Sequence, residues 1–393
     1  MNKKKIITRT ILLVSFVSFF NDIASEMLYP IMPVYLGSIG FSVLLIGILE
    51  GFAEATAGLS KGYFGNLSDK SGKRLPFVQF GYMLSAISKP MMAIFTYPLW
   101  IFTARTTDKL GKGIRTSARD AMLSDETTAE HKGKVFGFHR AFDTLGASIG
   151  PFLALIYLYF YPQQYKLLFF IAFAPGLCSI ILTFFIKEKK KVISDVANKA
   201  KIGFFSYFAY WKKSPKAYKL LIIGLLAFTF FNSSDAFLLL ALKANGMSDT
   251  QMIGVYIFYN LVYALAALPI GILADKIGLR KTLIIGLAIF AIVYLSMGFA
   301  IAWWQYAVIF FLYGLYAAST EGVSKALISN ISAKEETATA IGFYTSFASI
   351  FALLASSIGG LLFFYSPKLM FVFSGTGVVL VVVYFGFLKL NRN

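Results

Sequence analysis

Twelve long apolar stretches constrain the fold of this chain more than any other feature of its sequence. A transmembrane α-helix needs about 20 mainly apolar residues, and stretches long enough for this recur along all 393 residues. They lie at 9–37, 43–64, 75–95, 97–123, 133–160, 165–186, 218–243, 249–273, 282–300, 303–331, 337–364 and 367–389. The pattern predicts an all-α integral membrane protein with twelve transmembrane helices.

Basic residues are concentrated on alternate connections between these stretches. The formal net charge is +18, and Lys and Arg cluster at the N-terminus and at 70–74, 112–119, 132–134, 187–219 and 276–281. The connections near 38–42, 96–98 and 301–302 carry no charge. Cytoplasmic loops carry such an excess of Lys and Arg, so we expect a multi-pass protein of the cell (cytoplasmic) membrane with both termini cytoplasmic. The basic charge then faces anionic lipid rather than nucleic acid.

Residues 187–217 interrupt the apolar pattern near the middle of the chain. We therefore expect an N-terminal six-helix bundle (1–186), a cytoplasmic linker (187–217) and a C-terminal six-helix bundle (218–393). Within the linker, the aromatic sequence GFFSYFAYW has lysines on both sides. It favours equally an interfacial helix lying on the membrane and a disordered basic loop.

The two halves resemble each other at an offset of about 205 residues. GNLSDKSGKR (65–74) matches GILADKIGLRK (271–281), RDAMLS (119–124) matches SKALIS (324–329), and GFHRAF (137–142) matches GFYTSF (342–347). Many secondary transporters are built from such repeats, and their substrate sites lie near the bilayer midplane. The repeat predicts two pseudo-symmetric six-helix bundles.

The sequence repeated at 65–74 and 271–281 resembles a signature of the major facilitator superfamily, G-x-L-[AS]-D-[RK]-x-G-[RK]-[RK]. Together with the six-plus-six organisation, this resemblance implies the major facilitator fold and transport by alternating access. It also implies a gating role for the signature residues Gly65, Asp69, Lys73, Arg74, Asp275, Arg280 and Lys281. Their chemistry agrees, because Gly65 and Gly271 permit close helix approach, and Asp69 and Asp275 can cap a neighbouring helix or pair with an arginine.

Two further motifs are similar to those of the proton-driven antiporters in that superfamily. The fifth stretch contains Gly146-x-x-x-Gly150-Pro151, although spaced small residues are also a general helix-packing device. The sequence ARTTDKLGKGIRTSARDAM (104–122) resembles the antiporter motif of the fourth span only in part. Gly111 follows Arg105 by six residues, whereas the family pattern has four. This stretch is similar to that of a prokaryotic subgroup of facilitators.

The fourth stretch carries a stripe of charges on one helix face, because they recur three or four residues apart. The stripe consists of Arg105, Asp108, Lys109, Lys112, Arg115 and Arg119. By helical rise, Arg105 and Asp108 lie near the bilayer midplane, where ionisable groups need partners and mark substrate or proton paths. Other stretches offer as partners Asp22, Glu26, Glu50, Glu54, Lys89, His139, Arg140 and Asp143. The alternative interpretations are that Arg105–Asp108 is an internal ion pair and that Arg140–Asp143 is a structural pair with the fourth stretch.

We predict two roles for these polar residues. The predicted proton-coupling residues are Asp22, Glu26, Asp108 and Asp143. The predicted substrate-binding residues are Asn21, Arg105, His139, Arg140, Asn232, Asp235, Asn260 and Tyr313. Asp22 and Glu26 lie one helical turn apart, and two such close carboxylates do not both ionise easily; alternatively, Asp22 neutralises a basic residue on a neighbouring span. The predicted set contains charges of both signs, so the charge of the substrate stays open.

The sequence therefore predicts a secondary active transporter rather than an enzyme. We expect proton-coupled efflux of a small organic molecule by a monomer without a cofactor or bound metal. An ATP-driven pump is excluded by the absence of G-x-x-x-x-G-K-[ST]. The alternative is uptake of a metabolite, a chelate or a divalent cation, the last held by carboxylates of Asp22, Glu26, Glu50 and Glu54.

Overall fold

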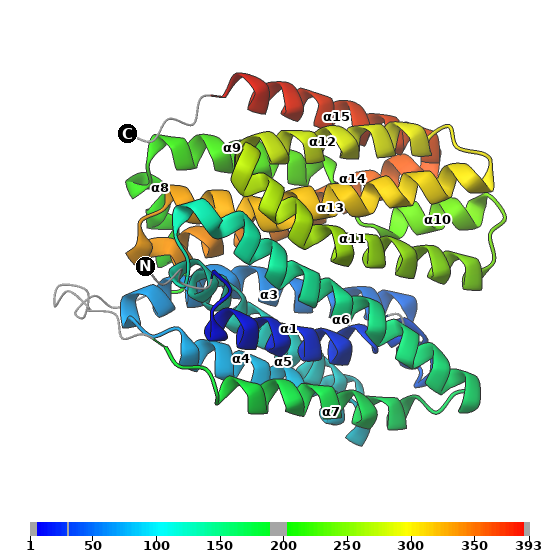
Figure 1. Ribbon diagram of the computed structural model, residues 1–393. Helices are drawn as coiled ribbons and strands as arrows, with labels where there is room; N and C mark the ends of the chain where they lie inside the picture. Colours follow the sequence, from blue (N-terminus) through cyan, green and yellow to red (C-terminus); the bar gives the residue numbers. More distant parts are fainter. Residues whose placement is uncertain (1–5, 30, 189–202, 389–393) are drawn as a thin grey trace. The chain divides into compact units, whose positions relative to one another are not determined.

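The computed structural model describes residues 6–29, 31–188 and 203–388, and the regular elements of this part are helices (Figure 1). The first half of the sequence forms α1 (Arg9–Glu26), α2 (Met32–Ser38), α3 (Val43–Ser71), α4 (Leu75–Ile94), α5 (Pro98–Asp125), η1 (Ala129–His131), α6 (Lys132–Phe160) and α7 (Tyr165–Thr183). The second half forms η3 (Ser206–Phe208), α8 (Ala209–Lys213), α9 (Lys216–Phe231), α10 (Ala236–Ala244), α11 (Asp249–Ile277), α12 (Leu279–Met297), α13 (Trp303–Ile331), η4 (Lys334–Glu336), α14 (Thr337–Tyr365) and α15 (Pro367–Phe387).

The helices follow the predicted apolar stretches closely, with two breaks that the apolar pattern does not indicate. The first stretch is divided into α1 and α2, and the seventh into α9 and α10. The second break contains the sequence NSSD (232–235). Asn, Ser and Asp side chains compete for backbone hydrogen bonds, and here the amide of Ala236 donates to Ser234 Oγ at 3.3 Å.

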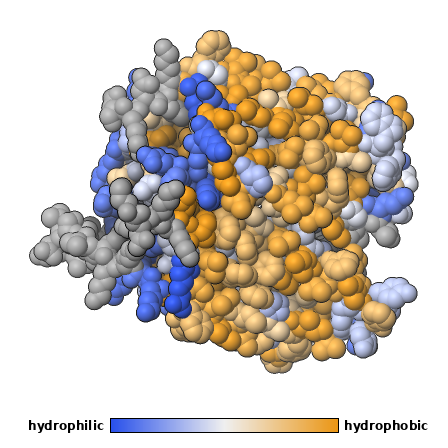
Figure 2. Space-filling model, in the orientation of Figure 1, coloured by the Kyte–Doolittle hydropathy of each residue, from blue (hydrophilic) through white to orange (hydrophobic). Residues whose placement is uncertain are grey.

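Eight helical segments of the described chain are long and apolar enough to cross a membrane by length and composition alone. The first four predicted spans fall outside this set, because polar and charged side chains interrupt their apolar sequence. Figure 2 shows apolar residues covering the flanks of the helices and hydrophilic residues gathered toward helix ends. Lipid suits such flanks, because helices satisfy their own backbone hydrogen bonds.

The helices form two compact units. The first unit comprises 1–127, 142–212 and 333–346, and the second comprises 128–141, 213–332 and 347–393. α6 and α14 therefore each contribute residues to both units. The predicted division of the sequence into two bundles joined by a linker stays a prediction, and residues 189–202 of that linker lie outside the described part.

Each unit has an apolar core. In the first, Met27, Tyr35 and Phe169 belong to one buried cluster, and Tyr35 donates its hydroxyl to the Met92 carbonyl at 2.7 Å. In the second, the rings of Phe290 and Tyr294 stack with centroids 4.1 Å apart. Buried tyrosine hydroxyls need a partner, so the bond made by Tyr35 fixes the position of its ring.

The aromatic end of the predicted linker is helical in η3 and α8. Tyr207 is buried, Asn66 of α3 donates to Ser206 Oγ at 2.7 Å, and Trp211 stacks on Phe343 at 5.7 Å. Exposed phenylalanines at 204 and 205 accompany these contacts. The structure therefore favours the helical interpretation of this segment, and its place on the membrane surface stays a prediction.

Both copies of the repeated signature form a turn between two helices. Gly72 follows α3 with φ 64°, and Gly278 joins α11 to α12 with φ 103°. Residues with a Cβ rarely adopt such φ values. The second glycine of each signature is therefore required by the backbone.

Candidate functional site

Arg105 of α5 is held by two carboxylates within the first unit. Its Nε and Nη2 donate to the Glu50 carboxylate of α3 at 2.7 and 2.8 Å, and its Nη1 lies 3.4 Å from Asp108. The Arg105 side chain is only 7% exposed. A two-pronged contact of this kind matches the planar guanidinium to the carboxylate, so α3 and α5 are fixed to each other here.

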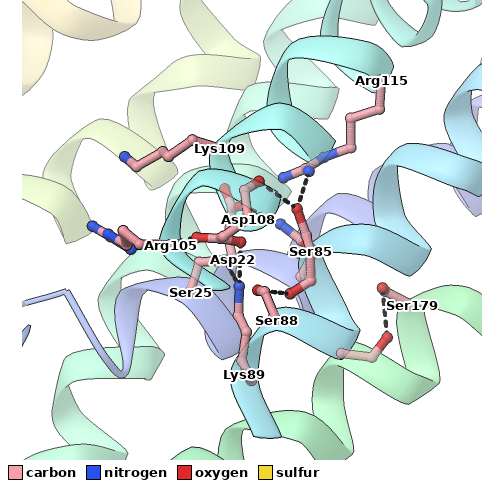
Figure 3. Close-up of polar contacts among 12 residues, drawn as sticks. Asp22, Ser25, Ser85, Ser88, Lys89, Arg105, Asp108, Lys109, Arg115 and Ser179 are labelled. Atoms are coloured by element: carbon pink, nitrogen blue, oxygen red, sulfur yellow. Dashed lines mark hydrogen bonds and ion pairs between the residues drawn. The ribbon is translucent and has the colours of Figure 1, made fainter. Parts of the chain in front are cut away.

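Lys89 of α4 points toward α5 and α1, as Figure 3 shows. Its Nζ donates to Asp108 at 2.7 Å and to Ser25 of α1 at 3.1 Å. The Lys89 side chain is 1% exposed and that of Asp108 is 11% exposed. A charge buried this deeply needs a charged partner, and Asp108 supplies it.

The other charges of the α5 stripe are held in a similar way. Lys109 pairs with Glu54 of α3. Arg115 donates to Ser85 at 2.6 Å and lies over the Tyr82 ring at 4.5 Å. Lys109 and Arg115 of the predicted stripe therefore face α3 and α4, whereas Lys112 is exposed.

Arg119 closes the stripe near the end of α5. It contacts Asp120 at 3.0 Å, Asp143 of α6 at 3.7 Å and Ser18 of α1 at 3.0 Å. Asp143 thus pairs with a basic residue of the fourth span, as the structural interpretation of that residue requires.

Asp22 and Glu26 of α1 have a different environment. Neither forms an ion pair with a Lys or Arg in the described residues, and Asp22 accepts a bond from Asn21 at 3.2 Å. Glu26 follows Asp22 by one turn on the same helix. In the described part of the chain, the carboxylates of Asp22 and Glu26 therefore form no salt bridge.

The G-x-x-x-G-P motif of α6 packs against α1 at these two carboxylates. A Cβ at Gly146 would lie 3.3 Å from the Asp22 Cβ, and one at Gly150 would lie 2.8 Å from the Ile23 carbonyl oxygen. Larger residues at these positions would push α1 away. The motif therefore positions the backbone that carries Asp22 and Glu26.

The first signature aspartate caps a helix and pairs with an arginine. Asp69 accepts from the amide and hydroxyl of Thr339, in the first turn of α14, at 2.6 and 2.8 Å. It also lies 2.8 Å from Arg74. Burial alone would lower the pKa of Arg74, but Asp69 and Asp125 raise it above its ordinary value. Both predicted contacts of Asp69 are therefore confirmed.

The second signature aspartate caps a helix at the equivalent position. Asp275 accepts from the amides of Gly133 and Lys134, in the first turn of α6, at 2.7 and 2.8 Å. First-turn amides have no partner within their own helix and favour negative charge. The two aspartates thus make matching contacts in the two halves of the repeat.

Close helix approach accompanies each cap. A Cβ at Gly65 would lie 2.5 Å from the Ala338 carbonyl oxygen, and one at Gly271 would lie 3.1 Å from the Gly137 Cα. The predicted role of both glycines in helix approach is confirmed. Arg280 donates to the Phe385 carbonyl at 3.0 and 2.6 Å, whereas Lys73 and Lys281 are exposed.

The second unit contributes a carboxylate at the break between α9 and α10. Asp235 accepts hydrogen bonds from Tyr313 of α13 at 2.6 Å and Tyr259 of α11 at 3.2 Å. Asn232 donates to the Tyr316 hydroxyl at 3.1 Å. The structure therefore brings together three of the predicted substrate-binding residues, Asn232, Asp235 and Tyr313.

The remaining predicted substrate-binding residues make other contacts. Arg140 of α6 pairs with Glu321 of α13 at 2.5 Å. His139, the preceding residue in the sequence, is buried. Asn260 is buried and donates to the Tyr256 carbonyl at 3.0 Å within α11. Tyr259 is not among the predicted residues; its recurrence with Tyr256 and Tyr263 at helical spacing is the available signal in the sequence.

The family model described as Major Facilitator Superfamily matches residues 14–256 and 220–393. The chain belongs to the major facilitator superfamily. Members of this superfamily are transporters, not enzymes. The chain is therefore a multi-pass membrane transporter of a small molecule with the twelve-helix major facilitator fold.

Relatives within the major facilitator superfamily include the "uncharacterized MFS-type transporter MJ1317" of Methanocaldococcus jannaschii. It is 34% identical over 385 residues, which cover 96% of this chain and 93% of the relative. The "multi-drug resistance efflux pump PmrA homolog" of Lactococcus lactis is 21% identical over 342 residues, covering 81% and 79%.

A solved structure supports the same fold. The Escherichia coli fucose:proton symporter FucP superposes with a TM-score of 0.77 at 11% identity, covering 99% of this chain and 100% of that one. At this identity the likeness shows the fold alone.

Proposed function

We propose that this transporter exports a small organic molecule across the cytoplasmic membrane in exchange for protons. The observation that carries the proposal is the environment of Asp22, a membrane carboxylate that forms no ion pair in the described residues and lies one helical turn from a second carboxylate, Glu26. Two carboxyl groups this close do not both ionise easily. Such a pair can take up and release a proton as its surroundings change.

The other predicted coupling residue, Asp108, suits this role less well. It contacts Lys89 and Arg105, and those two cations favour its charged form in every state that keeps the contacts. We therefore assign proton coupling to Asp22 and Glu26 and a structural role to Asp108. Asp143, whose contact with Arg119 is longer at 3.7 Å, is the next candidate for coupling. The multidrug efflux relative in Lactococcus lactis supports the outward direction.

Uptake of a metabolite or chelate is the alternative function, and uptake of a divalent cation is less favoured. The carboxylates predicted for such a cation are not gathered, because Glu50 and Glu54 contact Arg105 and Lys109. The described residues contain no group of three or more metal-binding side chains.

The direct test uses purified protein in liposomes with an imposed pH gradient. Three probes cover the charge classes: ethidium, chloramphenicol and anilinonaphthalene sulfonate. We expect at least one probe to move against its gradient only while protons flow in the opposite direction, and a protonophore to abolish that movement. Movement of the probe in the same direction as protons would favour uptake, and movement unaffected by the gradient would exclude proton coupling.

The signature aspartates provide a gating prediction. Asp69→Asn and Asp275→Asn each weaken a capped first turn, worth about 1 kcal/mol, which we expect to shift the balance between transport states. Transport should slow by about fivefold or more at unchanged substrate affinity, measured as initial rate and binding constant. Lys213→Gln, at an exposed position of α8 outside the signature, is the matched control. Loss of affinity with an unchanged rate would contradict gating.

Topology is tested by cysteine labelling. The native Cys178 is exposed, so Cys178→Ala provides the background. We expect Lys73→Cys to react with an impermeant maleimide only after cells are permeabilised, and Gln164→Cys to react in intact cells. The reverse pattern would overturn the proposed cytoplasmic location of the termini, because the charge asymmetry alone supports it.

A further inference from the structure

The break between α9 and α10 presents a carboxylate inside the membrane-spanning part of the second unit. Asp235 is the last residue of the break and is partly exposed, and its neighbours Ser234 and Ala236 are exposed. Interrupted transmembrane helices are where transporters of several folds place ligand groups. The Asp235 carboxylate therefore lies at such an interruption, between the two halves of a predicted span.

Asp235 has hydroxyl partners but no cationic partner. Its two oxygens accept from Tyr313 at 2.6 Å and Tyr259 at 3.2 Å. No Lys, Arg or His of residues 203–388 forms an ion pair with it. The neighbouring charge of Glu321 has the same sign. The two tyrosine hydroxyls thus orient the Asp235 carboxylate, but no cation of residues 203–388 neutralises its charge.

Aromatic rings surround this charge. The centroids of Tyr259 and Tyr313 lie 5.3 Å apart, those of Tyr313 and Tyr316 lie 5.2 Å apart, and Phe290 lies 4.9 Å from Tyr316. The faces of such rings attract cations. Carboxylate and rings therefore favour the same sign of ligand charge.

A buried acceptor at the start of the same break supports this conclusion. Asn232 Oδ1 is buried and has no hydrogen-bond partner among the described residues, while its amide nitrogen donates to Tyr316. Buried acceptors without a partner are costly. A ligand carrying an N–H group would satisfy Asn232 as well as Asp235.

Three buried cations of the first unit are already neutralised. Arg105, Lys89 and Lys109 are each paired with a carboxylate of that unit. An anionic ligand at any of these three would have to displace its carboxylate, whereas a cation at Asp235 displaces no ion pair.

We infer that Asp235, with the rings of Tyr259, Tyr313 and Tyr316, binds the positively charged group of an organic cation. This assignment of substrate class rests on the proposed transport function but concerns binding alone. Asp235 supplies the charge, Tyr259 and Tyr313 orient it, and the rings contact the apolar body of the ligand. Asn232 accepts a hydrogen bond from a protonated amine.

The test uses two probes of nearly equal size and opposite charge, tetraphenylphosphonium and tetraphenylborate. Binding of each radiolabelled ion to purified full-length protein in detergent is measured at equilibrium. We expect saturable binding of the phosphonium at least about tenfold tighter than that of the borate. Equal binding of both, or tighter binding of the borate, would overturn the inference without using any variant.

Variants then locate the site. Asp235→Asn should weaken phosphonium binding about tenfold or more, and Tyr313→Phe about threefold, because its hydroxyl only orients the carboxylate. Glu321→Gln removes a carboxylate already paired with Arg140, and Tyr306→Phe removes a hydroxyl on the same helix that bonds to Ala300. Both controls should bind as the wild type does.

The outcomes separate this inference from the proposed function. The Asp235→Asn variant is first shown to be folded by its elution as a single species in size-exclusion chromatography. If this variant binds the phosphonium as the wild type does, the site is excluded. Proton-driven export of chloramphenicol by a protein that does not bind the phosphonium would retain the function and reject the substrate class. Phosphonium binding through Asp235 without proton-driven transport would support the substrate class and reject the proposed function.

Discussion

Asp108→Asn is expected to be the most destabilising single substitution in the charged network of the first unit. It removes the carboxylate that lies 2.7 Å from Lys89, whose side chain is 1% exposed. The remaining ammonium would keep its hydrogen bond to the Ser25 hydroxyl at 3.1 Å but would have no carboxylate partner. Leaving a buried charge unpaired costs about 3–5 kcal/mol. A lower melting temperature in detergent and faster loss of monodisperse protein should report this cost.

A second substitution separates charge from side-chain loss. Lys89→Met in the Asp108→Asn background removes the orphaned charge and keeps an unbranched apolar side chain, so most of the lost stability should return. Thr103→Ala, at an exposed position of the same helix, should leave the melting temperature unchanged. A double variant no more stable than Asp108→Asn would show that the Lys89–Asp108 pair is not the source of the loss.

The same double variant also tests the role of Asp108 in coupling. If the pair is structural, the stable double variant should still carry out proton-driven transport. Loss of coupling in a well-folded double variant would instead restore Asp108 as a proton-coupling residue.

Much of the fold could be predicted because spacing and composition act locally. Twenty apolar residues in sequence have one stable arrangement in a bilayer, and the helix limits accordingly follow the apolar stretches. The repeated signature indicated that Gly72 and Gly278 matter to the fold, and the structure shows the reason: both residues have a positive φ. The break at 232–235 was present in the sequence as NSSD, but continuous hydropathy on both sides hid it.

The pairing within the site was less predictable because it depends on helix rotation. The stripe on α5 follows from spacing alone, yet spacing does not decide whether Arg105 meets Glu50 of α3 or Glu26 of α1. The structure shows Glu50. Likewise Arg140 and Asp143 are one turn apart in sequence, but they contact Glu321 and Arg119 respectively.

The two caps show how the repeat shaped both halves. Asp69 and Asp275 occupy the same position of the signature, and each accepts amide hydrogens in the first turn of a helix about 270 or 140 residues distant in sequence. The capped segments, 333–346 and 128–141, belong to the unit of the aspartate that caps them. Both aspartates can be recognised from the repeated signature in the sequence. Which helices they cap is known only from the structure.

Asp22→Asn and Glu26→Gln together are expected to abolish transport driven by a pH gradient while leaving exchange intact. Asparagine and glutamine keep the shape of the side chains but cannot carry the coupling proton. Because neither carboxylate forms an ion pair in the described residues, their neutralisation leaves no cation of a salt bridge unpaired. The protein should therefore remain folded. Gradient-driven transport by the double variant should fall by about tenfold or more, as expected for loss of an intramembrane proton carrier.

The measurement compares gradient-driven transport with counterflow at fixed pH in the same liposomes. Counterflow requires binding and alternating access but no net proton movement, so it should persist near the wild-type rate. Glu126→Gln, which removes a carboxylate bonded to Thr8 after the end of α5, is the matched control and should retain both activities. If the double variant still moves substrate against its gradient when driven by protons, Asp22 and Glu26 are not the coupling site. Asp143 would then be the first residue to replace, because it precedes by one turn Gly146 of α6, which packs against Asp22 of α1.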